Sequence, residues 1–71
     1  MSVIQSVLFN VNYWSIREAE EWLNNHNLHA IKDPEITKRF IHFRIFDPKV
    51  FKRFRTIKTR DHMDIIIGLL S

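Results

Sequence analysis

The sequence predicts a ferredoxin-like α+β domain, a split βαβ arrangement in which a four-stranded antiparallel sheet carries two helices on one face. Three observations predict this class. Four segments have the apolar pattern of strands, and two have that of amphipathic helices. Their order is strand, helix, strand, strand, helix, strand, with a turn signal at Asp33-Pro34 between the two middle strands. The pattern uses the whole chain without a linker or repeat, so we expect a single domain over residues 1–71.

The first part of the chain supplies a strand and a helix. Residues 3–9 read VIQSVLF, an apolar run of strand length that is rich in β-branched residues. Ser15 and Glu18 have the spacing of a capping box, in which each side chain bonds the backbone N–H of the other residue at a helix start. A stripe at helical spacing follows, and three asparagines end the predicted helix. The stripe consists of Ile16, Ala19, Trp22, Leu23 and His26.

The middle of the chain predicts a hairpin. We expect a short strand over residues 28–32, the turn at Asp33-Pro34, and a longer strand over residues 39–46. The longer strand reads RFIHFRIF and alternates between an apolar face and a mixed face. The apolar face carries Ile41, Phe43 and Ile45, and the mixed face carries Phe40, His42, Arg44 and Phe46.

The last part of the chain predicts a second helix and a final strand. Asp47-Pro48 has the form of a helix cap followed by proline at the first helical position. The apolar stripe of this short helix is Val50, Phe51 and Phe54. Residues 63–70 read MDIIIGLL, which predicts a strand buried on both faces or against a partner. In the alternative interpretation, residues 55–62 extend the second helix or form an extra hairpin.

The predicted fold leaves one face of the sheet without helices. The first and last strands are apolar on both faces, so this open face carries an apolar patch, which normally marks an interaction site. A chain of 71 residues buries only about 60% of the surface that its unfolded form exposes. We therefore expect a homodimer that forms through the open face or through an edge of the sheet.

The net charge of +3 is unevenly distributed along the chain. Residues 38–60 contain nine cations and one acid, Asp47, for a net charge of +8. The rest of the chain carries two cations and seven acids, three of which lie in the first predicted helix. The nine cations are Lys38, Arg39, Arg44, Lys49, Lys52, Arg53, Arg55, Lys58 and Arg60.

These nine cations are the predicted nucleic-acid-binding residues. Lysine and arginine bind phosphates, and the phenylalanines between them offer stacking surfaces, so we expect binding of nucleic acid, and specifically DNA, through phosphate contacts. Arg44 and Arg55 would hold one phosphate between two guanidinium groups if they lie close together, or each pairs with a nearby acid. In the alternative interpretation, the protein is a homodimeric structural module in virion assembly that uses its open sheet face or a strand edge.

Several classes of activity are not expected. Without cysteine there is no thiol chemistry and no cysteine-based zinc finger, and the four histidines show no paired spacing on one element, so we expect no metal. No nucleophile elbow or glycine-rich phosphate loop is present, and we expect no enzyme, no cofactor and no small-molecule substrate. No run of about 18 apolar residues occurs, and the start of the chain lacks the form of a signal peptide, which together predict no membrane partner and an intracellular location.

The pattern W-S-x-x-x-A-x-x-W-L, followed by F-R, D-P-x-x-F, F-R-T-I and I-I-G-L-L, resembles a small module of tailed-phage head-protease and morphogenesis proteins and of uncharacterised proteins of large DNA viruses. The resemblance implies a viral origin and a location in the virion or the host cytoplasm, and no activity is carried over from it. It spans about residues 14–70. The matching residues are Trp14, Ser15, Ala19, Trp22, Leu23, Phe43, Arg44, Asp47, Pro48, Phe51, Phe54, Arg55, Thr56, Ile57 and Gly68.

Overall fold

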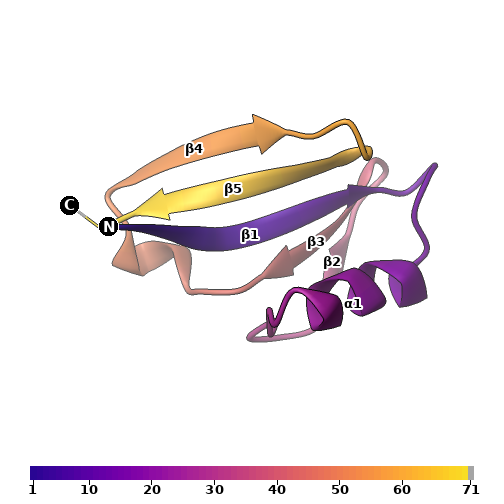
Figure 1. Ribbon diagram of the computed structural model, residues 1–71, viewed down its shortest axis with the longest axis horizontal. Helices are drawn as coiled ribbons and strands as arrows, with labels where there is room; N and C mark the ends of the chain where they lie inside the picture. Colours follow the sequence, from indigo (N-terminus) through magenta and orange to yellow (C-terminus); the bar gives the residue numbers. More distant parts are fainter. Residues whose placement is uncertain (71) are drawn as a thin grey trace.

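A computed structural model describes residues 1–70, which form an antiparallel sheet of five strands, one α-helix and one 3-10 turn (Figure 1). The strands lie side by side in the order β2-β3-β1-β5-β4, so the first strand of the chain is central and the two halves of the sheet extend from it. The elements in chain order are β1 (Ser2–Asn10), α1 (Ile16–Asn25), β2 (Glu35–Ile36), β3 (Phe40–Arg44), the 3-10 turn η1 (Pro48–Val50), β4 (Arg53–Lys58) and β5 (Met63–Leu69).

The predicted ferredoxin-like arrangement of four strands and two helices is wrong, because the second helix does not form. The Asp47 carboxylate does cap the chain by accepting a hydrogen bond from the Lys49 N–H at 2.9 Å, but the turn that it starts ends at Val50. The next residues are extended, and β4 has β-branched Thr56 and Ile57 in its second half and pairs along its whole length with β5. Residues 55–62, for which the alternative interpretation allowed a longer helix or an extra hairpin, form the second half of β4 and the turn that leads to β5.

The predicted strand over residues 28–32 and the turn at Asp33-Pro34 are also wrong. Only residues Glu35–Ile36 pair with β3, and the turn between these two strands lies further along the chain. Thr37 closes this turn, since its hydroxyl accepts the Phe40 N–H at 3.0 Å and its own N–H donates to the Phe40 carbonyl at 2.9 Å. These bonds close the hairpin between β2 and β3.

The other sequence-derived elements are confirmed. The capping box is present in both directions, because the Ser15 hydroxyl accepts the Glu18 N–H at 3.1 Å and the Glu18 carboxylate accepts the Ser15 N–H at 3.0 Å. The first strand, the alternation of β3 and the last strand also form as expected. Asn27 takes a left-handed conformation just after the helix, with φ of 56°.

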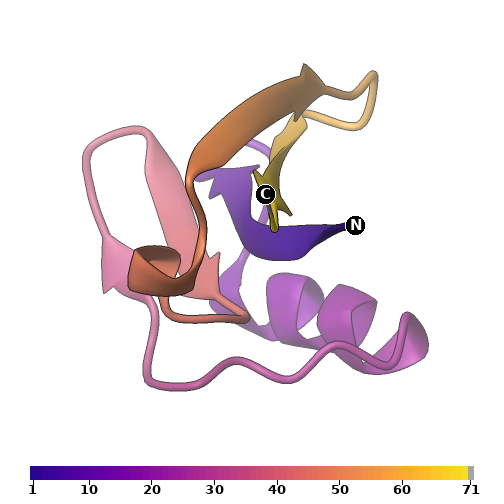
Figure 2. The ribbon, with the colours of Figure 1, turned by 90° about the vertical axis from the view of Figure 1, so that its left-hand side faces the viewer.

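The hydrophobic core lies between α1 and one face of β1, β3 and β5. Phe9 is its centre, fully buried and in edge-to-face contact with the rings of Trp14, Trp22 and Phe43. Figure 2 looks along the long axis and shows α1 on one side of the sheet, while the connection through η1 crosses on the other side. The buried cluster consists of Val7, Phe9, Ala19, Leu23, Ile41, Phe43, Ile45 and Met63.

Candidate nucleic-acid interface

β4 forms one edge of the sheet, and all six of its residues are exposed. At about 3.3 Å per residue the strand is about 20 Å long. An edge strand also carries a row of backbone N–H and C=O groups that have no partner strand. Such an edge, rich in cations, is open to an extended ligand.

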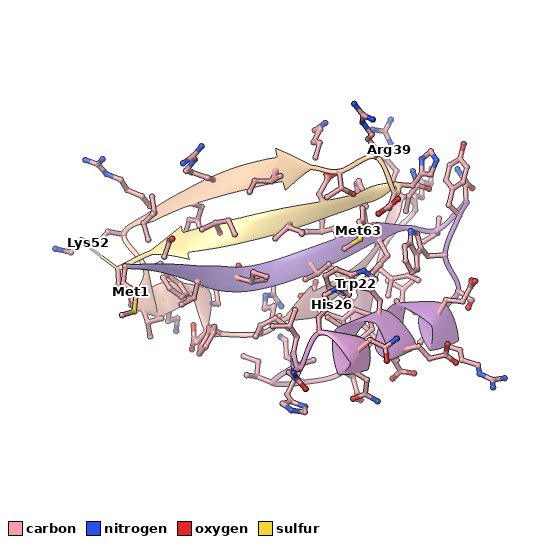
Figure 3. All side chains as sticks on the ribbon, in the orientation of Figure 1. Met1, Trp22, His26, Arg39, Lys52 and Met63 are labelled. Atoms are coloured by element: carbon pink, nitrogen blue, oxygen red, sulfur yellow. The ribbon has the colours of Figure 1, made fainter. Side chains whose placement is uncertain are left out.

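The predicted nucleic-acid-binding residues lie along β4, on η1, in two turns and, in the case of Arg44, on β3. Four of them lie on β4 or directly before it, and Lys49 lies on η1. The remaining exposed ones lie in two turns at the other end of the sheet. The end of β1 and the residue after it bind these two turns, since the Asn10 N–H donates to the His62 carbonyl at 3.0 Å and the Val11 N–H donates to the Arg39 carbonyl at 2.9 Å. Figure 3 shows Lys52 at one end of β4 and Arg39 at the opposite end of the sheet, with nitrogen-tipped side chains between them. The β4 group is Lys52, Arg53, Arg55 and Lys58, and the turn group is Lys38, Arg39 and Arg60.

Most of these cations have no acidic partner. Within residues 1–70 the ion pairs are Arg17 with Glu21 at 3.4 Å and Arg44 with Glu35. Eight of the nine predicted binding residues are therefore exposed and free of an ion pair within that part of the chain, and Arg44 is the exception. The positive charge of the segment is available to a polyanion.

Arg44 and Arg55 do not form a joint phosphate site. Across the sheet, Arg44 is in register with Ser6 of β1 and, through it, with Ile66 of β5. Arg55 of β4 is instead in register with Ile67, the residue after Ile66. Because successive residues of a strand point to opposite faces, the two arginines project from opposite faces of the sheet. The acid that pairs with Arg44 is Glu35, which lies on β2, the strand next to β3.

A shallow groove of about 280 Å³ lies on the face of the sheet that α1 does not cover. β1 and β5 form its floor, β3 and β4 form its two sides, and η1 lies at one end. One of its sides is therefore the same strand that carries the row of free cations. The lining residues are Gln5, Ser6, His42, Arg44, Pro48, Phe54, Thr56 and Ile66.

Three aromatic rings form a cluster beside this groove. Phe51 is only 8% exposed and lies edge-on between Phe46 and Phe54, at centroid distances of 6.2 and 5.9 Å. Its ring lies directly over Gly68 of β5, where a side chain would collide with it. The outer rings are nearly half exposed, and that of Phe54 lines the groove.

His42 is an unusual member of the groove. Its Nε2 atom is buried and has no hydrogen-bond partner within residues 1–70. Burial lowers the pKa of His42, and the positive charge of Arg44 lowers it further, with Glu35 acting in the opposite direction. The hydrogen bond and the charge of the Arg44 guanidinium hold the pKa of the Glu35 carboxyl below its usual value. At neutral pH the groove therefore contains a neutral imidazole beside an ion pair.

The lowered pKa of His42 predicts a loss of stability in mild acid. The unfolded chain binds a proton at His42 more readily than the folded chain does. The contribution of His42 to the free energy of unfolding is therefore complete above the ordinary pKa of 6.5 and is lost as the pH falls below it. We expect the free energy of unfolding, measured in urea at a series of pH values from about 7.5 to 5, to fall less steeply for His42→Gln than for the native chain. His29→Gln, which removes an exposed histidine outside the groove, is the control for the loss of a histidine as such. Identical slopes for all three proteins would contradict this role of His42.

The sequence interpretation identified the cations but not the groove. Gln5 and Ser6 were visible only as two polar interruptions in an apolar strand, and both are buried. They adjoin a bulge in β1, where the pairing with β5 shifts register between Ile4 and Ser6. The Gln5 amide donates to the Phe46 carbonyl at 2.7 Å, and the Ser6 hydroxyl donates to the Gln5 amide oxygen. Buried polar residues within an apolar run were the one available signal for this groove.

Residues 1–70 contain no group of three or more histidine or acidic side chains placed to hold a metal ion, and no helix in them is long and apolar enough to cross a membrane. No protein-family model, curated protein or solved structure matches the chain. The geometry of the site is therefore the basis for assigning a function.

Proposed function

We propose that this protein binds nucleic acid without catalysis, through phosphate contacts with the cations of β4. The observation that supports this function is the row of four cations on or next to a fully exposed edge strand, none of them in an ion pair within residues 1–70. The virion or host cytoplasm as the location rests on the resemblance to the viral module.

The spacing of the row suits a polyanion. Arg53 and Arg55 lie two residues apart on the same face of β4, which separates them by about 6.6 Å along the strand. Lys58 projects from the other face, so a strand of nucleic acid that follows the edge meets cations on both sides. Phosphate contacts of this kind position a nucleic acid without reading its sequence, so we propose affinity that depends little on sequence.

The turn group extends the same surface. Arg60 lies in the turn after β4, and Arg39 lies at the same end of the sheet. Arg44 is assigned no phosphate contact in this proposal, because Glu35 already neutralises its guanidinium.

Binding should weaken steeply as salt rises. Four phosphate contacts predict a slope of about −3 in the logarithm of the association constant against the logarithm of salt concentration for a single strand. The double variant Arg53→Gln/Arg55→Gln should reduce the magnitude of that slope by about 1.4 units, because the two phosphates that are no longer contacted keep their counterions. Fluorescence anisotropy of labelled DNA between about 50 and 300 mM salt measures both values.

A matched control separates the position of the charge from its amount. Arg17→Gln/Lys32→Gln lowers the net charge by the same two units but removes cations that lie outside the basic segment. We expect this variant to keep nearly the native slope. Equal losses in the two double variants, or no binding by the native protein at about 50 mM salt, would refute the proposed function.

The second candidate function is a homodimeric structural module. It is favoured by exposed apolar side chains around η1 and β4, since exposed apolar clusters mark contact surfaces. Direct pairing of two β4 strands is opposed by the repulsion of their cations. Dimerisation through apolar contacts should persist at high salt, in contrast to phosphate binding, and light scattering at low and high salt tests it. The exposed apolar residues are Phe46, Val50 and Phe54.

A further inference from the structure

The groove between β3 and β4 combines three kinds of group that the phosphate contacts do not use. It has the half-exposed ring of Phe54, the apolar surfaces of Ile66 and Pro48, and polar atoms on Ser6, Thr56 and His42. The Nε2 atom of His42 is buried without a partner within residues 1–70. A buried nitrogen without a hydrogen bond lowers stability, and a ligand that bonds it would relieve that cost. The groove therefore has the composition of a site for a planar group with both an apolar face and a polar edge.

We propose that this groove holds one unstacked nucleobase, so that the protein binds single-stranded nucleic acid in preference to duplex. The inference rests on the proposed function, since the cations of β4 would hold the backbone on which that base is carried. The base would lie against Phe54 and present its polar edge to His42 and to the hydroxyl of Thr56.

The position of β4 links the two parts of this site. Phe54 and Thr56 line the groove from one face of the strand, while Arg53 and Arg55 project from its other face. A single strand lying along the edge can therefore place phosphates next to the cations and turn a base into the groove. Charge complementarity favours a polyanion over a neutral or basic partner, because no acid of residues 1–70 is paired with the β4 cations.

The size of the groove favours one ring system. Its volume of about 280 Å³ lies just below the range of roughly 300–1,000 Å³ that is typical of sites for drug-sized ligands. Aromatic side chains bind bases of single strands by stacking, and this contact is available only after a base has left its paired stack. A duplex would have to open a base pair before using the groove, which predicts weaker binding of duplex.

Three labelled probes of equal length test the inference. They are a thymine single strand of about 15 nucleotides, a duplex, and a single strand made of abasic sites, which keeps the phosphates but has no bases. We expect the thymine strand to bind more tightly than the other two at the same salt concentration.

Phe54→Ala and Ile57→Ala form a matched pair of variants, because both side chains lie on β4 and each is 47% exposed, but they project from opposite faces. We expect Phe54→Ala to weaken binding of the thymine strand by about 5- to 140-fold and to leave binding of the abasic strand unchanged. Ile57→Ala should change neither. If Phe54→Ala lowers the melting temperature below the range of the assay, Phe54→Leu keeps an apolar group and removes the ring.

A second measurement is independent of these variants. In NMR titrations with thymidine monophosphate, the imidazole protons of His42 should shift, while those of the exposed His29 should not. Such a shift supports a base in the groove, and the absence of any shift at saturation overturns it.

The outcomes distinguish the two proposals. Equal affinity for the three probes, with Phe54→Ala and Ile57→Ala behaving alike, would overturn the base site and leave the phosphate function standing. No salt-dependent binding of any probe would overturn both. An aromatic peptide that shifts His42 while thymidine monophosphate does not would reassign the groove to a protein partner and also overturn the base site.

Discussion

Replacing Phe9 by alanine should remove most of the stability of this domain. Phe9 is fully buried and lies at centroid distances of 4.9, 5.8 and 5.9 Å from Trp14, Trp22 and Phe43. The loss of a buried phenylalanine costs about 3–5 kcal/mol, from lost burial and from the cavity that remains. A domain of 71 residues has a total stability of about 4–11 kcal/mol, so the loss is a large share of the total and leaves the variant unfolded at room temperature if the native stability lies at the lower end of that range.

Urea denaturation followed by tryptophan fluorescence measures this loss, because both tryptophans contact Phe9. Phe9→Leu, which keeps part of the volume, should lose less than Phe9→Ala. The control is Phe46→Ala, since Phe46 is 45% exposed and lies outside the core. Similar losses for Phe9→Ala and Phe46→Ala would show that the centre of the core lies elsewhere.

Replacing Gly68 by alanine should destabilise the fold by about 1–3 kcal/mol, the usual cost of adding a group to a packed site. A Cβ atom at this position would lie 2.6 Å from the Cγ and Cδ1 atoms of the Phe51 ring. No carbon contact tolerates that distance, and Phe51 is held between Phe46 and Phe54. The ring must therefore move away from β5.

A double-mutant cycle identifies the collision as the cause. Phe51→Ala alone should destabilise the protein, because it removes a buried ring. In the Phe51→Ala background, Gly68→Ala should then cost little, since the obstructing ring is gone. Thermal unfolding of the four proteins gives the coupling energy. Additive losses would mean that Gly68 is required for a reason other than its contact with Phe51.

Local signals predicted the elements whose stability is decided by neighbouring residues. The capping box at Ser15 and the alternation of residues 40–44 needed no information from distant parts of the chain, and both are confirmed. The segment after η1 was different, because Phe51 and Phe54 have a spacing that suits one face of a helix. Their rings instead gather on one side of β4 and β5, and the missing side chain of Gly68 provides the space. That space depends on a residue 17 positions away from Phe51 and gives no local signal.

The candidate site divides in the same way. The cations of residues 38–60 were evident from charge counting. Only the fold shows which of them are paired: Glu35 forms an ion pair with Arg44, and no acid of residues 1–70 forms one with the cations of β4. The groove could not be predicted, because it brings Ser6 and Thr56 together across β5 from segments separated by 50 residues.

The strand order of the sheet has a consequence for how this protein is made. β1 leaves the ribosome before the other four described strands, but its neighbours are β3 and β5, and β5 is the last of these strands. A nascent chain that ends before residue 63 therefore has a central strand with one open side, and a β4 with no strand beside it. Non-local pairing of this kind is slow to form, and apolar strand edges stay exposed until the pairing is complete. The cations of β4 would then act early in the protein's life, by keeping unfinished chains apart until the last strand closes the sheet.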